Sequence, residues 1–230
     1  MSSLGFHRIE RESITSKVHG NLKEQILSGR LPPGTHLLES TIAEQMQVSR
    51  SPVREAFRWL ERDGLIDLRS NQGAFVRSLT VVEISEIYTV RALLEGYAAA
   101  LAAEKAGEQE ARSLRQSLER LLRLAREGGV EATLAADFDV HRHVWEIAGH
   151  HLLQELLDRL EVQIRMFLSA QAPSFEDLYS SVQSHTEIID AIEAHNPTAA
   201  RESMEKHITE AGTLTLTRLR TVRGEWVPSR

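Results

Sequence analysis

The feature that most constrains this fold is a pair of short helical patterns separated by a tight turn. The first pattern runs from Thr41 to Met46, and the second lies in VSRSPVREAFRWLERDGL, residues 48–65. In the second pattern Ser51 is a suitable N-cap, Pro52 suits the first helical position, and apolar residues then recur at helical spacing. Two short helices joined by a tight turn predict a helix-turn-helix.

Segments on both sides of this pair extend it into a compact module. Upstream, Thr15–Leu27 has an amphipathic helical pattern, and LPPGTHL predicts a turn that leads into a short extended piece. Downstream, LIDLRSNQGAFV predicts two strands joined by a turn at residues 70–73. A helix-turn-helix followed directly by a β-hairpin is a winged helix, a module that most often binds DNA.

The start of the second helix carries the candidate DNA-reading residues. In helix-turn-helix proteins this end of the helix enters the major groove, where a guanidinium can bind guanine through two hydrogen bonds. Arg50 and Arg54 are suited to this contact, Ser49 and Ser51 suit phosphate oxygens or base edges, and Gly73 would let the wing approach the minor groove. The alternative is that both arginines are solvated residues on a winged helix that binds protein.

The stretch VSRSPVREAFRWLERDGLI, with LPPGTHL before it and NQGAFV after it, resembles the DNA-binding domain of the GntR family of bacterial transcriptional regulators. The resemblance covers residues 9–78 and implies a winged helix, with the helix-turn-helix near residues 39–58. Some members of the FadR branch carry a further DNA-contacting arginine where this chain has Ser40. The resemblance therefore implies no arginine contact from the first helix of the pair.

Charge is divided unevenly along the chain. The net charge is -6, but residues 1–78 hold 11 Lys and Arg against 9 Asp and Glu, a net of +2. The remaining residues hold 16 against 24, a net of -8. A mildly basic front and an acidic rear are compatible with a small DNA-binding module attached to a domain that has another task.

Cysteine content and hydrophobic runs narrow the class of protein. There is no cysteine, which excludes disulfides, thiolate metal sites and a cysteine nucleophile. The N-terminus has no apolar signal-like segment, and the most apolar run, LLEGYAAALAA, is about half the length that a membrane-spanning helix needs. A cytoplasmic protein with no membrane partner is expected.

The second domain, expected at residues 79–222, has helical patterns and no strand pattern. Thr80 and Glu83 predict a capping box ahead of its first helix, ISEIYTVRALLEGYAAALAAEKA. Five further helices are expected at Gln109–Arg126, Val130–Ile147, Leu152–Ala170, Phe175–Ala194 and Thr198–Arg220. The expected fold class is therefore mostly α, with an N-terminal winged helix-turn-helix and small β-hairpin wing followed by an all-α antiparallel bundle of six helices.

Histidines are concentrated in this bundle, where residues 141–207 hold seven of the chain's ten. Asp137 and His141 are four residues apart on one predicted helix, a spacing that lets two ligands on adjacent turns face one ion. His185 and His207 lie on separate later helices, with apolar residues at offsets that would turn each side chain inward. For any one histidine alone, a core or surface position is the more common explanation.

The stretches ADFDVHRHVWEIAGHHLL and SHTEIIDAIEAHNPTAARESMEKH resemble the ligand-binding FCD domain of the FadR subgroup. There an Asp-x-x-x-His pair and two later histidines hold a metal ion, and the pattern falls here on Asp137, His141, His185 and His207. Asp139 with His143 has the same spacing and is the alternative register. The resemblance implies that the four other histidines of this region lie outside the ligand set, as surface residues: His143, His150, His151 and His195.

Three imidazoles and one carboxylate suit zinc, with nickel, manganese and iron as alternatives. Four protein ligands can leave positions open for water or for the carboxylate of an effector. The resemblance also implies that Arg91 faces the same cavity, where its guanidinium would bind that carboxylate. The alternative for Arg91 is a surface salt bridge with Glu95, four residues along the helix.

Together these expectations describe a bacterial DNA-binding transcriptional regulator rather than an enzyme. We expect a homodimeric repressor that binds double-stranded DNA at a palindromic operator and is controlled by a small organic acid at the metal site. One alternative is a regulator for which the metal itself is the signal. Another is a metal-dependent hydrolase, although no nucleophile motif or second carboxylate accompanies the predicted ligands.

Overall fold

The computed structural model describes residues 13–70, 72–127, 129–171 and 178–222 of the chain. These residues form two compact units, one ending at Arg77 and the other beginning at Ser78. Each unit has a buried apolar core of its own. Within the described ranges, no helix combines the length and the apolar character needed to cross a membrane.

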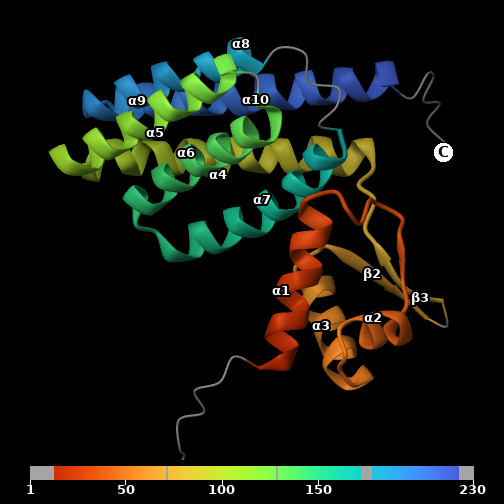
Figure 1. Cartoon of the computed structure of the whole chain (residues 1–230). Coiled ribbons are helices and arrows are strands. Elements are labelled where there is room, and N and C mark those ends of the chain that lie inside the picture. The colour runs from red at the N-terminus through yellow and green to blue at the C-terminus, as the bar shows by residue number, and fades with distance from the viewer. Residues whose placement is uncertain (1–12, 71, 128, 172–177, 223–230) are drawn as a thin grey trace, which may run out of the picture. The chain divides into compact units, whose positions relative to one another are not determined.

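The described part of the N-terminal unit consists of three helices and three short strands (Figure 1). They are α1 (Ile14–Leu27), β1 (His36–Leu37), α2 (Glu39–Gln45), α3 (Arg50–Arg62), β2 (Ile66–Arg69) and β3 (Gly73–Val76). Val18, Leu22 and Ile26 form a buried stripe on α1, which packs against the buried face of α3. Because α3 is anchored through that face, its opposite face is left to solvent.

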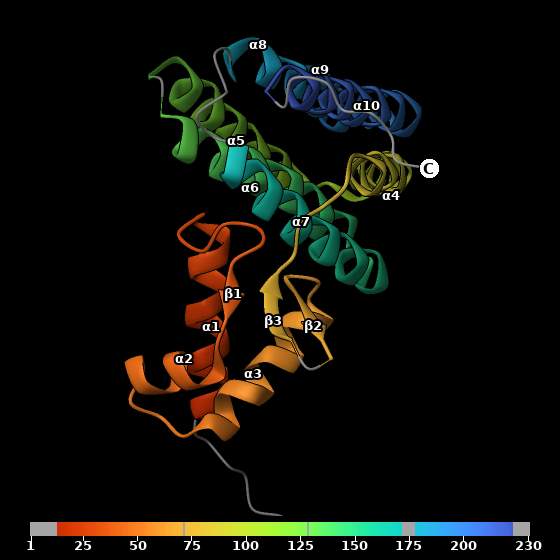
Figure 2. The same ribbon diagram turned by 90° about the vertical axis from the view of Figure 1, so that its right-hand side faces the viewer.

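The strands form one antiparallel sheet in the order β1-β3-β2 (Figure 2). The predicted hairpin of β2 and β3 is confirmed, and the extended piece upstream pairs with it as a third strand, with His36 opposite Phe75. Gly73 has a φ of +95°, and a Cβ atom there would lie 2.7 Å from Nε2 of His36. The sheet therefore requires glycine at this position. Asn71, part of the predicted turn, lies outside the described residues.

Both helices of the helix-turn-helix begin two residues earlier than expected. The first begins at Glu39, and in the second the prediction of Ser51 as N-cap is wrong. Ser49 takes the N-cap position with extended backbone (φ -71°, ψ 165°), and Arg50 is the first helical residue. Pro52 is still accommodated because the N–H groups of the first helical turn have no partner within the helix.

The described part of the C-terminal unit is a bundle of helices without strands. Its members are α4 (Val81–Lys105), α5 (Glu108–Glu127), α6 (Val130–Ala148), α7 (His151–Gln171), α8 (Leu178–Gln183), α9 (His185–Glu193) and α10 (Pro197–Val222). The predicted capping box is confirmed at the start of α4, where Thr80 and Glu83 exchange hydrogen bonds.

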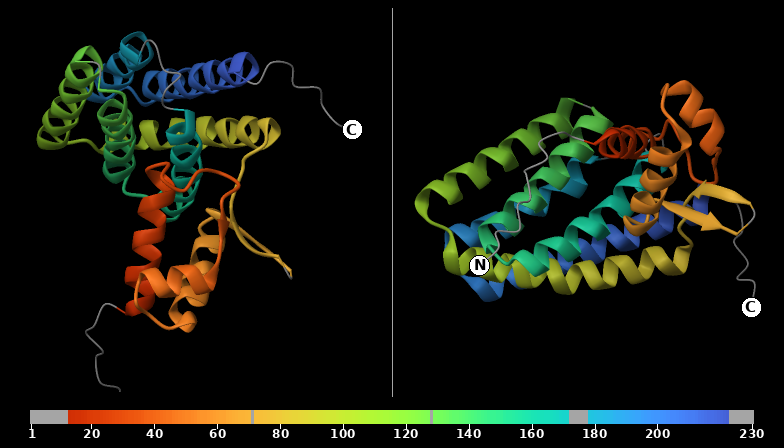
Figure 3. Two further views of the ribbon diagram at one scale, coloured as in Figure 1. Left: turned by 45° about the vertical axis from the view of Figure 1, so that its right-hand side comes forward. Right: turned by 90° about the horizontal axis from the view of Figure 1, so that it is seen from below.

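The most extensive helix pair of this bundle is the one between α4 and α10. The two helices run antiparallel (Figures 1 and 2), while α5 and α6 lie side by side (Figure 3). A Cβ atom at Gly212 of α10 would lie 2.8 Å from the side chain of Tyr88 on α4. The glycine therefore permits the close approach that brings residues of α4 and α10 to one cavity.

The expectation of six helices is wrong, because the segment predicted as one helix from Phe175 to Ala194 is divided. Helix α8 ends at Gln183 and α9 begins at His185, while Phe175 lies outside the described residues. At the break, Nδ1 of His185 donates a hydrogen bond to the carbonyl of Val182 (3.0 Å). The side chain thereby satisfies an acceptor near the end of α8, where helical partners are lacking.

Candidate metal centre and DNA-reading face

Four of the five residues predicted to contact DNA lie at the N-terminus of α3. Ser49 is the N-cap residue, but its side chain makes no capping hydrogen bond. Arg50, Ser51 and Arg54 are exposed, with a relative exposure of 60% for the Arg54 side chain. The fifth residue, Gly73, is the first of β3. The geometry is that of a helix end open to a ligand, with two cationic side chains beside it.

Arg54 is held by an acidic residue on the other helix of the pair. Its Nε lies 3.0 Å from one carboxylate oxygen of Glu39 and its Nη2 lies 2.8 Å from the other. Hydrogen bonding from Arg54 lowers the pKa of Glu39, and the charge of Arg50 adds to the effect. A two-point contact orients a guanidinium more narrowly than a single one. Glu39 was missed in the sequence, although an acid in the first turn of α2 was a visible signal.

The wing carries an exposed arginine and an exposed histidine on either side of one aromatic ring, an arrangement that the sequence patterns did not reveal. The ring of His36 stacks on Phe75, with 4.5 Å between the centroids, and the Arg69 guanidinium lies 4.5 Å from the Phe75 centroid. His36 and Arg69 are exposed. Stacking thus holds an arginine and a histidine beside Gly73 on the hairpin.

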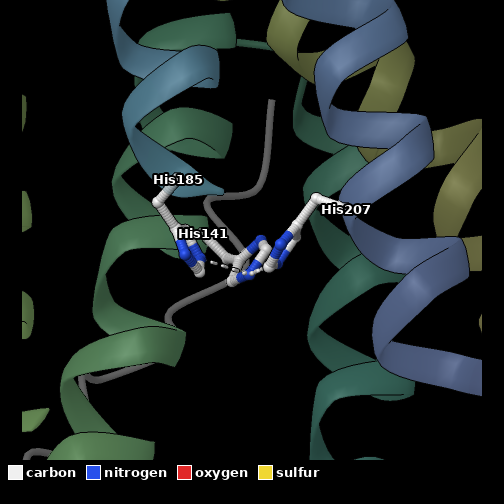
Figure 4. Close-up of side chains that lie close together, drawn as sticks. All are labelled: His141, His185 and His207. Carbon is white, nitrogen blue, oxygen red and sulfur yellow. Dashed lines mark hydrogen bonds between the residues drawn. The ribbon is translucent and has the colours of Figure 1, made fainter. Parts of the chain in front are cut away.

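Three histidines from three helices meet inside the C-terminal unit, with their rings turned toward one another (Figure 4). His141 lies on α6, His185 begins α9 and His207 lies on α10, and all three are buried. Nε2 of His141 lies 3.2 Å from Nε2 of His185 and 3.3 Å from Nε2 of His207. Nitrogen ligands at about 2.0–2.1 Å from a tetrahedral ion lie about 3.3 Å apart, so this spacing is compatible with a set of metal ligands.

The remaining nitrogen of each ring, Nδ1, faces an oxygen atom. In His185, Nδ1 lies 3.0 Å from the Val182 carbonyl. In His207 it lies 2.7 Å from the Ser184 hydroxyl, and in His141 it lies 2.6 Å from the Glu95 carboxylate. A carbonyl and a carboxylate can only accept, which assigns the proton to Nδ1 in His185 and His141. When both rings are neutral, their Nε2 lone pairs face each other across 3.2 Å, an arrangement that a cation would stabilise.

Asp137, the predicted carboxylate ligand, lies beside this cluster and is less buried than the imidazoles. Its Oδ1 is 3.4 Å from Nε2 of His185 and its Oδ2 is 3.9 Å from Nε2 of His141. The structure thus brings all four predicted ligands together, with the three histidines closest to one another. Three imidazoles and one carboxylate fit a divalent transition metal such as zinc.

A buried ion pair on α4 supports the cluster. Nε of Arg91 lies 2.7 Å from Oε1 of Glu95, whose Oε2 faces Nδ1 of His141. The contact to His141 is close but bent, because Nδ1–H points off the line to the oxygen. Arg91 is 5% and Glu95 is 0% exposed. The alternative prediction of a salt bridge with Glu95 is therefore right about the partner but wrong about its place at the surface. Sequence reasoning missed the link from Glu95 to His141.

Burial and neighbouring charges shift the pKa values of these side chains in different directions. Burial lowers the pKa of His185 and lowers the pKa of His207 to well below its usual value, which favours the neutral form that binds metals. Burial acts likewise on His141, but the charge of Glu95 raises the pKa of that ring. Burial alone would raise the pKa of Glu95, yet Arg91 and His141 lower it to about 2. The Glu95 carboxylate therefore stays charged inside the bundle.

A cavity of about 60 Å³ adjoins the histidine cluster. Arg91, Asp137, His141 and His207 line it, so the predicted effector-binding arginine and three predicted metal ligands share one cavity. Apolar side chains of α6, α7 and α10 form much of the remaining wall. Such a site, with a few polar groups converging in an apolar pocket, is suited to a small anionic ligand.

The alternative register at Asp139 and His143 is not assembled in the structure. Asp139 lies 3.5 Å from Arg120, while Nδ1 of His143 lies 3.2 Å from the Ser117 hydroxyl. His143 is partly buried rather than at the surface as expected. The other histidines that were predicted to lie at the surface are exposed: His150, His151 and His195.

Comparison with protein families matches each unit to a separate model. The model of bacterial regulatory proteins of the gntR family matches residues 14–76, and the FCD domain model matches residues 86–210. The matched ranges contain the exposed end of α3 and all four residues of the histidine and aspartate cluster, respectively.

Relatives and solved structures agree with this division. The chain is 34% identical over 201 residues to the "Probable D-xylose utilization operon transcriptional repressor" of Paenarthrobacter nicotinovorans, covering 87% of this chain and 88% of that protein. It is 23% identical over 199 residues to the HTH-type transcriptional repressor RspR of Escherichia coli K12, covering 86% and 87%. The solved structure of E. coli McbR/YncC has the same fold, with a TM-score of 0.78, 23% identity and coverage of 91% and 100%.

Proposed function

The chain belongs to the GntR family of bacterial regulatory proteins, with an FCD domain in its second half, and we propose that it is a homodimeric repressor whose operator binding is controlled by a small carboxylic acid at a metal centre. Its matched domains and its relatives are transcriptional regulators. This protein is therefore a transcriptional regulator and not an enzyme. Two relatives are described as repressors, which supports repression here. Acting on an operator, it would be cytoplasmic.

The observation that carries this proposal is the convergence of three imidazole Nε2 atoms beside the Arg91 guanidinium. With Asp137, the histidines would hold a divalent metal ion, zinc being the best match, which would supply a Lewis-acid position for a carboxylate oxygen. Arg91 would bind the same carboxylate from the wall of the cavity. The ion pair with Glu95 supports this role, because it fixes the arginine and keeps it charged.

The size of the cavity supports a small effector. A water molecule needs about 10–15 Å³ of such volume, so about 60 Å³ has room for roughly four to six water-sized groups. An acid with three or four carbon atoms matches this space.

On the DNA side, we propose Arg50 and Arg54 as base readers, Ser49 and Ser51 as phosphate contacts, and Gly73 as the point where the wing approaches the minor groove. The exposure of the arginines and the two-point contact of Arg54 with Glu39 support this. In a dimer, two such helices would enter successive major grooves of a palindromic operator. A coupling of about 1–3 kcal/mol between acid binding and dimer geometry would change DNA affinity about 5- to 150-fold.

Native mass spectrometry of the full-length protein tests the assembly and the metal. We expect the mass of a dimer with one divalent ion for each chain, together with the mass of any co-purified acid. Protein that remains metal-free after incubation with zinc, nickel, manganese or iron would contradict the metal centre. The four ligand residues would then need another explanation.

Operator binding tests the control by an acid. Binding sites are selected from random double-stranded DNA with purified protein, and the affinity for the selected site is measured with zinc alone and with zinc plus acids of three or four carbons. A change in affinity that needs both zinc and an acid supports the proposal. Release of DNA by zinc alone, with no effect of any acid, would replace it with a regulator for which the metal is the signal.

A further inference from the structure

One buried hydroxyl in the cavity wall has no role in the proposed function. Thr133, on α6, is 0% exposed, and within the described structure its Oγ1 has no hydrogen-bond partner. The residue lines the same cavity as Arg91, Asp137 and His141. Buried hydroxyls without partners are rare because each costs stability. An unpartnered hydroxyl in the wall of a ligand cavity can take its partner from the ligand.

The position of Thr133 on α6 relates it to the candidate metal ligands. Thr133, Asp137 and His141 follow one another at intervals of four residues, so they lie on one face of the helix. Four residues of α-helix rise about 6 Å, which puts Thr133 one turn beyond Asp137 on the side away from His141. A molecule that reached both the metal centre and Thr133 would extend along this face by the length of a short carbon chain.

Other hydroxyls of the cavity differ from Thr133 in having partners. The Tyr88 hydroxyl and Oγ1 of Thr215 lie 3.2 Å apart, and both residues are buried in the wall. This pair satisfies itself across α4 and α10 without a ligand. Thr133 is flanked instead by apolar neighbours such as Leu134 and Phe138, which line the cavity beside it.

We infer that Thr133 is a specificity-determining residue that binds a second polar group of the effector, at the end remote from the carboxylate. The inference rests on the proposed function, in which the carboxylate lies at the metal centre and Arg91. It narrows the ligand class to acids of three or four carbons with a hydroxyl or a second carboxylate at the far end. An unsubstituted alkyl end would leave the Thr133 hydroxyl buried without a partner, and sites of this kind strongly reject such analogues.

The first test needs no ligand and uses the substitution Thr133→Val, which keeps the shape of the side chain and removes the hydroxyl. If the hydroxyl lacks a protein partner, the melting temperature of the ligand-free, full-length protein rises by about 2–4 °C. Thr215→Val is the matched control, because it deprives the Tyr88 hydroxyl of its partner and lowers the melting temperature. A decrease in Thr133→Val similar to that in Thr215→Val would show that the hydroxyl has a structural role and would overturn the inference.

The second test measures selectivity by calorimetry on the zinc-loaded, full-length protein. Butyrate and 3-hydroxypropionate have the same number of non-hydrogen atoms and differ only in a terminal methyl or hydroxyl group. We expect the wild-type protein to bind 3-hydroxypropionate at least tenfold more tightly, and Thr133→Val to lose or reverse this preference. A preference that survives in Thr133→Val overturns the inference, as does equal binding of both acids by the wild-type protein.

Binding of neither acid by the zinc-loaded protein also counts against Thr133 as a reader of acids of this size. That result is distinguishable from failure of the proposed function, which the native mass and the operator measurements judge separately. A protein that takes up zinc and responds to another acid on its operator, but does not bind this pair, retains the proposed function and loses the inference about Thr133.

Discussion

Nδ1 of His141 lies 2.6 Å from Oε2 of Glu95, and the other oxygen of the same carboxylate lies 2.7 Å from Nε of Arg91. One buried carboxylate thus orients a candidate metal ligand and the candidate effector-binding arginine. The two partners come from different helices, α6 and α4. Carboxylates that hold the second nitrogen of a metal-binding histidine set its tautomer and increase its basicity.

The substitution Glu95→Gln tests this relationship. We expect zinc affinity, measured by competition with a chelator, to fall about 10- to 100-fold, because His141 loses the charge that favours its Nδ1–H tautomer. Glu104→Gln is the control, since Glu104 is an exposed residue of the same helix. Circular dichroism establishes that both variants are folded. Equal zinc affinity in the two variants would show that His141 does not depend on Glu95.

The substitution His185→Ala removes one of the three converging nitrogens. We expect zinc affinity to fall by more than about 100-fold, since loss of a ligand costs more than loss of its supporting contact. Zinc at a hundredfold excess over its dissociation constant stabilises the wild-type protein by about 2.7 kcal/mol, and thermal unfolding should show that this gain is lost. His143→Ala, on α6, should keep it. The opposite pattern would favour the register of Asp139 and His143.

The substitution Arg54→Ala tests the reading of base edges by α3. Loss of a two-point contact to a base should reduce affinity for the selected operator about 5- to 150-fold and relax the preference at one base pair. Arg62→Ala removes the same charge at the other end of α3 and should weaken binding much less. Fluorescence anisotropy with the operator and with scrambled DNA separates the effects. Equal losses on both DNAs would assign Arg54 to phosphate binding.

The substitution Gly73→Ala tests the construction of the wing. A side chain at φ +95° is strained, and its Cβ would contact the ring of His36 at 2.7 Å. We expect the free energy of unfolding of the N-terminal unit to fall by about 1–3 kcal/mol in chemical denaturation. Gly20→Ala is a control of opposite sign, because Gly20 is helical with open space around it and alanine should add about 0.5–1 kcal/mol. An unchanged stability in Gly73→Ala would show that the hairpin relaxes around the new side chain.

Local patterns were sufficient to predict most helices and the hairpin. The stripe of α1 and the capping box at Thr80 depend on residues three or four positions apart, so the sequence displays them directly. The division between α8 and α9 was not predictable in this way. It involves a hydrogen bond from the His185 ring to the Val182 carbonyl, and an apolar repeat does not show which side chain will bond to the backbone.

The candidate site was predictable in part. The spacing of Asp137 and His141 on one helix was visible, and the resemblance to a known domain added His185 and His207, which the structure brings to the same place. Glu39 and Thr133 were missed. Glutamate and threonine are both common in helices, so the sequence does not single these two residues out. The role of Glu39 depends on its partner, and the role of Thr133 depends on the absence of a partner.

The sequence by itself determined the two-part organisation, the helices and which residues lie at the N-terminus of α3. These features depend on residues that are close together along the chain. Only the tertiary structure decided which polar groups meet. Arg54 reaches Glu39 across 15 residues, and His141 reaches His185 and His207 across 44 and 66. The packing of α4, α6, α9 and α10 also decided how deeply each group is buried, and burial sets the charge of an imidazole and the cost of an unpartnered hydroxyl.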